Sequence, residues 1–264
     1  INVLRLFPLY TKLNMKLVVL TNGSKHGLEI IRQLNKDDIN LECILIEKKM
    51  IRKKELDLLK SKLGKAAFII PLIPFKNSIY RTFRNVKYND TTRKTLEKFC
   101  KNVHKVSNLN GKDSEALLKS IQPDLLILGG CRIIKENILK IPKLGTLNAH
   151  PGILPYYRGL DVIKWALFND DTPGVTVHFV NSGIDTGEIC TYEKLQLTNN
   201  ISIDALKKQS INVSALLISK TVLEIDKNGK KTTFSNETNK GKYYRKMPKE
   251  IHEKLLKKLS KNEK

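Results

Sequence analysis

Short apolar runs alternate along this chain with segments whose apolar residues recur every three or four positions, the spacing of one helix face. The apolar runs predict strands at 16–21, 41–46, 124–130, 144–147 and 175–180. The segments with helical spacing predict helices at about 28–34, 50–63, 113–121, 161–168 and 201–223. We therefore predict an α/β fold, with a mostly parallel, Rossmann-like sheet of about seven strands, helices on both faces and a short C-terminal extension.

The length of 264 residues and the composition predict one large domain with an extension at each end. Residues 1–14 precede Met15 and carry no clear small-residue cleavage site, so we interpret them as an N-terminal extension and not as a signal peptide. Residues 15–225 form the domain, with a basic insertion at about 71–105, and residues 226–264 form a basic C-terminal extension. The hydrophobic share of 41% suits a globular core.

Charge, hydropathy and cysteine usage bound the function classes. No apolar run reaches the roughly 20 residues of a membrane span, so we expect no membrane partner. The formal net charge of +22 attracts nucleic acid or anionic small ligands, but we favour the alternative that the lysines are scattered over solvated faces. The cysteines are widely spaced, which predicts reduced thiols, a cytoplasmic location and no bound metal. They are Cys43, Cys100, Cys131 and Cys190.

An amide and an imidazole stand side by side where a predicted strand ends. Asn148 and His150 are two residues apart, so both point to one face of an extended chain, and Pro151 ends the hydrogen-bond ladder. An Asn can donate to a developing oxyanion, a His can transfer a proton, and a carboxylate such as Asp185 can orient the His. These groups suit attack of an amine on an acyl carbon by direct transfer. A polar strand end with a structural His is the alternative that the spacing leaves open.

Three separated motifs occur in an order that resembles the folate-dependent formyltransferases. They are PDLLILGGCRII at 123–134, GTLNAHPGILPYYRG at 145–159 and GVTVHFVNSGIDTGEI at 174–189. The resemblance implies an enzyme that transfers a formyl group from N10-formyltetrahydrofolate to an amine. It also implies that Asn148 polarises the formyl oxygen, that His150 stabilises the tetrahedral intermediate and that Asp185 orients His150.

The same resemblance places the ligands. The pterin of the folate would lie against the backbone of two loops, at Gly130, Cys131, Arg132, Ile133 and Ile134 and at Gly183 and Gly187. From the residues, we expect the acceptor to contact a turn before the first helix, where backbone donors and a lysine favour phosphate, and also the YRG turn. These residues are Gly23, Ser24, Lys25, Tyr157, Arg158 and Gly159. Lys25 and His26 depart from the Gly- and Ser-rich loop of glycinamide ribonucleotide transformylase at this place. From the residues alone, the glycines can equally be plain turn formers.

The acceptor is the least determined part. The YRG turn, the insertion and the short tail resemble the sugar-nucleotide N-formyltransferases, which predicts a small, nucleotide-linked amine. Methionyl-tRNA and glycinamide ribonucleotide remain alternative acceptors. Formyltetrahydrofolate hydrolysis or a non-catalytic basic binding module are alternatives of another class, and a homodimer is left open.

Overall fold

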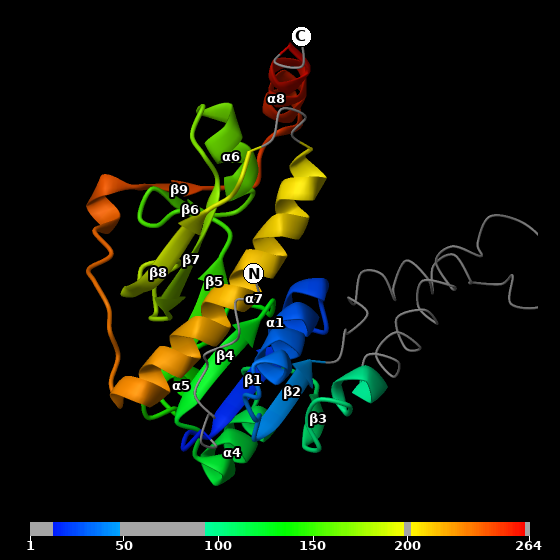
Figure 1. Ribbon diagram of the computed structural model, residues 1–264, viewed down its shortest axis with the longest axis vertical. Helices are drawn as coiled ribbons and strands as arrows, with labels where there is room; N and C mark the ends of the chain where they lie inside the picture. Colours follow the sequence, from blue (N-terminus) through cyan, green and yellow to red (C-terminus); the bar gives the residue numbers. More distant parts are fainter. Residues whose placement is uncertain (1–12, 48–92, 198–201, 262–264) are drawn as a thin grey trace, which may run out of the picture.

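The computed structural model describes residues 13–47, 93–197 and 202–261 (Figure 1). Nearly all of the N-terminal extension, the helix predicted at 50–63 and most of the insertion predicted at about 71–105 lie outside the described residues.

A seven-stranded sheet forms the centre of the molecule, in the order β3-β2-β1-β4-β5-β7-β8. The first five strands run parallel, and β7 and β8 run antiparallel to their neighbours. The mostly parallel α/β fold predicted from the sequence is therefore confirmed. In sheet order, the strands are β3 (Val103–Val106), β2 (Cys43–Glu47), β1 (Leu17–Thr21), β4 (Leu125–Gly129), β5 (Gly145–His150), β7 (Gly174–Phe179) and β8 (Ile189–Lys194).

Helices cover both faces of this sheet, because its central strands are apolar on both sides (Figure 1). In β1, Leu17 and Val19 pack toward one face, and Val18 and Leu20 toward the other. Helices α1 (Lys25–Lys36) and α7 (Ile203–Asn228) cover the first face. Helices α4 (Lys112–Ile121) and α5 (Glu136–Leu139) cover the second.

The C-terminal segment returns to the sheet and builds a second, smaller one. Phe234 forms an antiparallel bridge with Ile189, and β9 (Lys242–Tyr244) pairs in parallel with β6 (Tyr157–Gly159). Helices α6 (Val162–Phe168) and α8 (Lys249–Lys261) and the 3-10 turn η1 (Thr238–Lys240) complete this region. The C-terminal segment thus packs against the rest of the fold near β6 and β8.

The strand register brings the predicted functional loops to one edge. Thr21 lies opposite Gly129, and Leu128 lies opposite Asn148. Because β1, β4 and β5 are parallel, the segments that follow them emerge side by side at their carboxyl ends, where open α/β sheets bind ligands.

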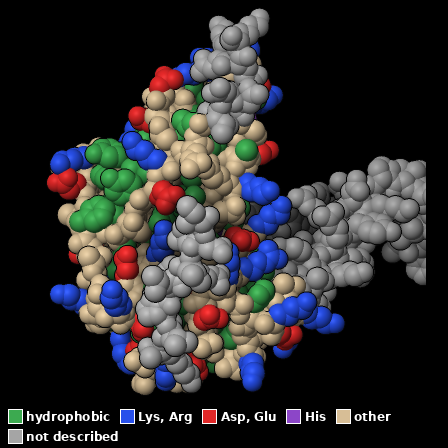
Figure 2. All heavy atoms as spheres, in the orientation of Figure 1, with side chains coloured by type: hydrophobic (Ala, Val, Ile, Leu, Met, Phe, Trp, Pro, Cys, Tyr) green, Lys and Arg blue, Asp and Glu red, His purple; other side chains and the backbone are tan. Residues whose placement is uncertain are grey.

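Lys and Arg side chains lie scattered over the face shown in Figure 2, mixed with Asp and Glu. This distribution favours solvated faces over a single basic patch on that side. Among the described residues, no helix is both long and apolar enough to cross a bilayer.

Candidate functional site

Strand β5 carries Asn148 and His150 on one side, because alternate residues of a strand share a face. The strand continues to His150, three residues beyond the predicted end, because its last residues pair with β7. Asn148 lies opposite His178, and His150 lies opposite Thr176. His150 is buried, with only 4% of its surface exposed.

Both ring nitrogens of His150 face acceptors. Nε2 lies 2.7 Å from the backbone oxygen of Tyr157, so this nitrogen carries a hydrogen and donates it. Nδ1 lies 3.5 Å from Oδ2 of Asp185. With Nε2 committed to Tyr157, only a doubly protonated ring would present an N–H to Asp185. Nδ1, on the side of Asp185, is therefore the nitrogen able to exchange a proton.

Asp185 is held in a left-handed backbone conformation with φ of 54°. Its side chain is only 13% exposed. Oδ2 of the carboxylate accepts a hydrogen bond of 2.9 Å from the backbone N–H of Gly159. The trio predicted from the sequence therefore lies together, although Asp185 follows a strand that runs opposite to β5.

His178 is a fourth member of this cluster that the sequence analysis left out. Its Nδ1 donates to the backbone oxygen of Phe179 over 2.8 Å, so Nε2 is the acceptor that faces Nδ2 of Asn148 at 3.2 Å. Burial, reinforced by the nearby charge of His150, lowers the pKa of His178 to about 4. His178 is thus neutral, and its 3.8 Å approach to Asp185 is no ion pair.

The neutral His178 orients the amide of Asn148. One amide hydrogen of Asn148 is directed to His178, and the second remains for another acceptor. A register shift between β7 and β8 falls between Val177 and His178. Such bulges redirect side chains next to functional sites, and this one lies at the residue that fixes Asn148. A register shift leaves no signal in the alternating pattern from which the strand was predicted.

The YRG turn forms β6 and holds His150 and Asp185 through its main chain. The carbonyl of Tyr157 accepts from His150, and the N–H of Gly159 donates to Asp185. Arg158 donates from Nη2 to the backbone oxygen of Thr238 over 3.4 Å, and its buried Nε has no partner among the described residues.

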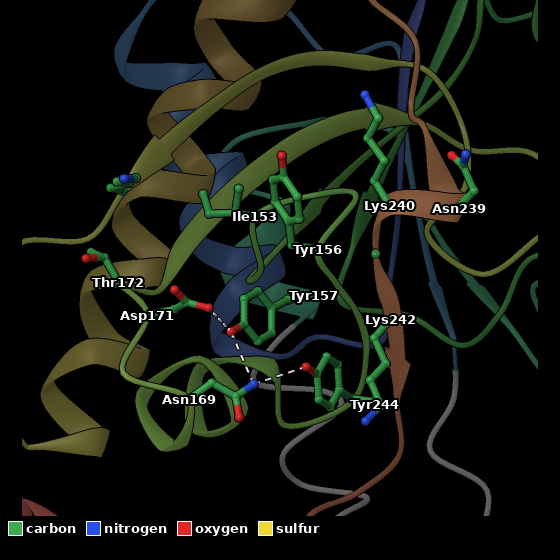
Figure 3. Close-up of a pocket in the computed structure, with 12 residues that line it drawn as sticks. Ile153, Tyr156, Tyr157, Asn169, Asp171, Thr172, Asn239, Lys240, Lys242 and Tyr244 are labelled. Carbon is green, nitrogen blue, oxygen red and sulfur yellow. Dashed lines mark hydrogen bonds between the residues drawn. The ribbon is translucent and has the colours of Figure 1, made fainter.

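The side chain of Tyr157 points into a cavity of about 620 Å³ (Figure 3). Its hydroxyl donates to Asp171 and accepts from Nδ2 of Asn169, which also contacts the hydroxyl of Tyr244. The cavity is therefore closed on one side by an aromatic and polar network that the backbone of Tyr157 connects to His150.

The predicted cofactor loop after β4 is fastened to its neighbours. Glu47 at the end of β2 pairs with Nε of Arg132 at 2.8 Å and accepts from the N–H of Leu109. Asn110 donates to the carbonyl of Ile133 over 2.9 Å. The side chain of Ile133 itself is 74% exposed, an apolar surface on a fixed loop.

Within the same loop, burial raises the pKa of the Cys131 thiol to about 12, so it contributes no nucleophile. Ile134 is buried against α5 and the second face of the sheet. Gly130 has φ of 69°, and an added Cβ would lie 2.4 Å from Oγ of Ser24. The backbone turn itself therefore requires this glycine.

The second predicted cofactor loop precedes β8. Close approach requires both of its glycines, since a Cβ at Gly187 would lie 1.8 Å from the oxygen of Phe179, and one at Gly183 would lie 2.1 Å from Oγ1 of Thr186. Local folding explains these glycines without a ligand. Ile184 between them is 43% exposed.

The predicted acceptor turn, Gly23 to Lys25, lies at the start of α1. Oγ of Ser24 caps the helix by accepting from the N–H of Gly27 over 3.3 Å. Helix α1 packs so closely on β4 that a Cβ at Gly27 would lie 2.3 Å from the oxygen of Gly129. The positive end of α1 is thereby held at the edge that carries Asn148, with Lys25 exposed beside it.

Comparison with known proteins identifies the fold and its family. A family model described as formyl transferase matches residues 15–222. Methionyl-tRNA formyltransferase of Clostridioides difficile (strain 630) is 32% identical over 122 residues, which are 45% of this chain and 40% of that protein. The bifunctional polymyxin resistance protein ArnA of Wigglesworthia glossinidia brevipalpis is 35% identical over 123 residues, 46% of this chain and 19% of that protein. The chain thus spans less than half the length of these curated relatives.

Solved structures share the fold at low identity. A 4-N formyltransferase from Francisella tularensis superposes with a TM-score of 0.57 at 16% identity, over 88% of this chain and 77% of that one. Glycinamide ribonucleotide transformylase 1 from Symbiobacterium toebii superposes with a TM-score of 0.55 at 15% identity, over 81% and 88% of the two chains.

Proposed function

Because this chain belongs to the formyl transferase family, we propose that it transfers a formyl group from N10-formyltetrahydrofolate to the amine of a nucleotide-linked amino sugar. The observation that carries the proposal is the convergence of Asn148, His150 and Asp185 at the carboxyl edge of the sheet, with His150 and Asp185 both held by β6.

Asn148 stabilises the oxygen that becomes negative when the amine attacks the formyl carbon. Its amide already donates one hydrogen to His178, so its orientation is set before the reaction and its second hydrogen can serve the oxyanion. Because the donor is pre-oriented, little reorganisation is needed as the charge develops.

His150 and Asp185 stabilise the charge of the tetrahedral intermediate and transfer its protons. The imidazole supplies a positive charge beside the tetrahedral intermediate and exchanges a proton through Nδ1, the nitrogen that faces Asp185 at 3.5 Å. Asp185 stabilises the charged imidazole and accepts or relays the proton that the attacking amine loses. Collapse of the intermediate would break the bond between the formyl carbon and N10, and N10 would take up that proton as tetrahydrofolate leaves. No serine or cysteine nucleophile is needed, since the amine attacks directly.

The two loops predicted for the folate suit a flat, partly apolar ring. Ile133 and Ile184 expose apolar side chains on loops whose backbones are fixed by Asn110 and by the glycines of the second loop. N10-formyltetrahydrofolate would supply the activated formyl group, and these loops would hold its pterin.

The start of α1 supports an acceptor that carries phosphate. The N–H groups of its first turn and the exposed Lys25 favour an anion at the edge that bears Asn148. Arg158, from β6, is a second cationic group for that role. On the face drawn in Figure 2, the Lys and Arg side chains of the described residues lie among Asp and Glu side chains.

Methionyl-tRNA is the second candidate acceptor, favoured by the curated relatives that match about half of this chain. The matched stretches cover only part of each protein. They therefore show similarity in the shared region and say less about the acceptor.

A panel of acceptors at one ionic strength tests the proposal. Initial rates with N10-formyltetrahydrofolate are measured for amino-sugar nucleotides, methionyl-tRNA and glycinamide ribonucleotide, with His150→Ala as the inactive control. We expect the highest kcat/KM for an amino-sugar nucleotide. Faster formylation of methionyl-tRNA would overturn the acceptor, and release of formate without any acceptor would favour hydrolysis.

A further inference from the structure

Asn236, in the C-terminal segment, reaches back to the loop that carries Asp185. Its Nδ2 donates to the backbone oxygen of Asp185 over 3.1 Å and to that of Gly187 over 2.9 Å. These contacts join residues about 50 positions apart. One of the two contacted residues is Asp185, whose carboxylate faces His150.

This loop needs an external restraint. Asp185 adopts φ of 54°, a conformation that costs about 1 kcal/mol or more for a residue with a side chain. The carboxylate is positioned by one hydrogen bond from Gly159, and the backbone that carries it is fastened by the two donors of Asn236. Without those donors, the loop is free to relax toward an unstrained backbone and move the carboxylate away from His150.

The other end of the Asn236 side chain shows that its orientation is imposed. Oδ1 of Asn236 is buried and has no hydrogen-bond partner among the described residues. A buried unpaired acceptor costs about 1–3 kcal/mol. Rotating the amide by half a turn would place Oδ1 against two carbonyl oxygens, which would repel it. The amide therefore keeps its two donor contacts, and Oδ1 stays without a partner.

We propose that Asn236 is a positioning residue for formyl transfer, which fixes the catalytic carboxylate of Asp185 through the main chain of its loop. The inference rests on the proposed function, because it takes Asp185 as part of the reacting cluster. It assigns to the C-terminal segment a part in catalysis beyond closing the small sheet.

The test compares Asn236→Asp, which keeps the shape and replaces the donating Nδ2 by an oxygen, with Ser235→Asp. Ser235 is the exposed neighbour, so its substitution adds the same charge to the same segment. We expect Asn236→Asp to lower kcat about 10- to 100-fold, because small displacements of a catalytic group cost this much. Ser235→Asp should retain the wild-type rate, and Asn236→Ala, the milder change, should lie between them.

A double-mutant cycle separates positioning from general damage. If Asn236 acts through Asp185, adding Asn236→Asp to Asp185→Asn should lower the rate by less than twofold further. Independent, multiplying losses would overturn the inference, as would a wild-type kcat for Asn236→Asp.

Amide hydrogen exchange tests the same point without turnover. The N–H of Gly159 bonds to Asp185, whereas the next N–H, of Leu160, bonds to the oxygen of Tyr244 in β9. In Asn236→Asp, exchange at Gly159 should accelerate at least tenfold and exchange at Leu160 should not change. Equal rates at Gly159 in both proteins would refute the inference even if the wild type proves inactive with every acceptor, an outcome that counts against the proposed function alone.

Discussion

Protonation of His178 should destabilise the protein in mild acid and release Asn148. The pKa of this buried imidazole falls from 6.5 to about 4, whereas the unfolded chain keeps the ordinary value. The unfolded state therefore binds the proton first, and stability is complete above pH 6.5 and is lost as the pH falls toward 4. At about 1.4 kcal/mol for each pKa unit, the whole effect is about 3 kcal/mol, of which about 2 kcal/mol develops between pH 7.5 and 5.

Urea denaturation of the wild type and of His178→Gln at several pH values measures this contribution. The variant loses two hydrogen bonds and should be less stable at pH 7.5. The gap should then shrink by about 2 kcal/mol at pH 5, because only the wild type carries this histidine. The pKa of His26, at the start of α1, is also lowered to about 4, but it is common to both proteins and cancels in the difference.

The matched control is His104→Gln, which removes an exposed histidine from β3. It shows how much of any change with pH comes from removing a histidine as such. A gap between the wild type and His178→Gln that does not change with pH would refute the argument, since His178 would then titrate alike in both states.

Four further substitutions test the site. His150→Ala and Asp185→Ala should each lower formyl transfer by about 10²–10⁴ with melting temperatures close to the wild type, in steady-state assays; near-normal turnover would remove either residue from the mechanism. Asn148→Ala should cost about 10²–10³ in kcat with little change in folate affinity, and a purely KM effect would contradict its role as oxyanion donor. Gly159→Ala should destabilise the protein by about 2 kcal/mol in urea, because φ is 101° and the new Cβ would lie 2.2 Å from the oxygen of Tyr244; unchanged stability would show that β9 can move.

The sequence predicts the large elements well because their signals are local. The buried strands β1, β2, β4 and β7 and the long helix α7 occur within a few residues of their predicted positions, since each carries its own apolar pattern. The short strands β6 and β9 carry too few residues for any periodicity. They form only because segments about 80 residues apart meet.

For the candidate site, too, the sequence predicts one part and leaves another part out. The types and order of Asn148, His150 and Asp185 can be read from the sequence, because side-chain chemistry depends on residue identity. The groups that hold them are a carbonyl, an N–H and the donors of Asn236, of which the first two belong to the backbone. A main-chain group cannot be recognised from the residue type. His178 orients Asn148 only as the tautomer that accepts at Nε2, and its neighbours determine that tautomer.

The pairing of β6 with β9 also sets the order in which the protein can mature during synthesis. Strands β1 to β8 are synthesised before Asn236 and β9, so the sheet can begin to form while the loop of Asp185 is not yet held by Asn236. Closing a contact over such a separation is slow compared with local folding. A nascent chain of this protein should therefore pass through a stage in which the sheet has formed and the loop of Asp185 is not yet held by Asn236.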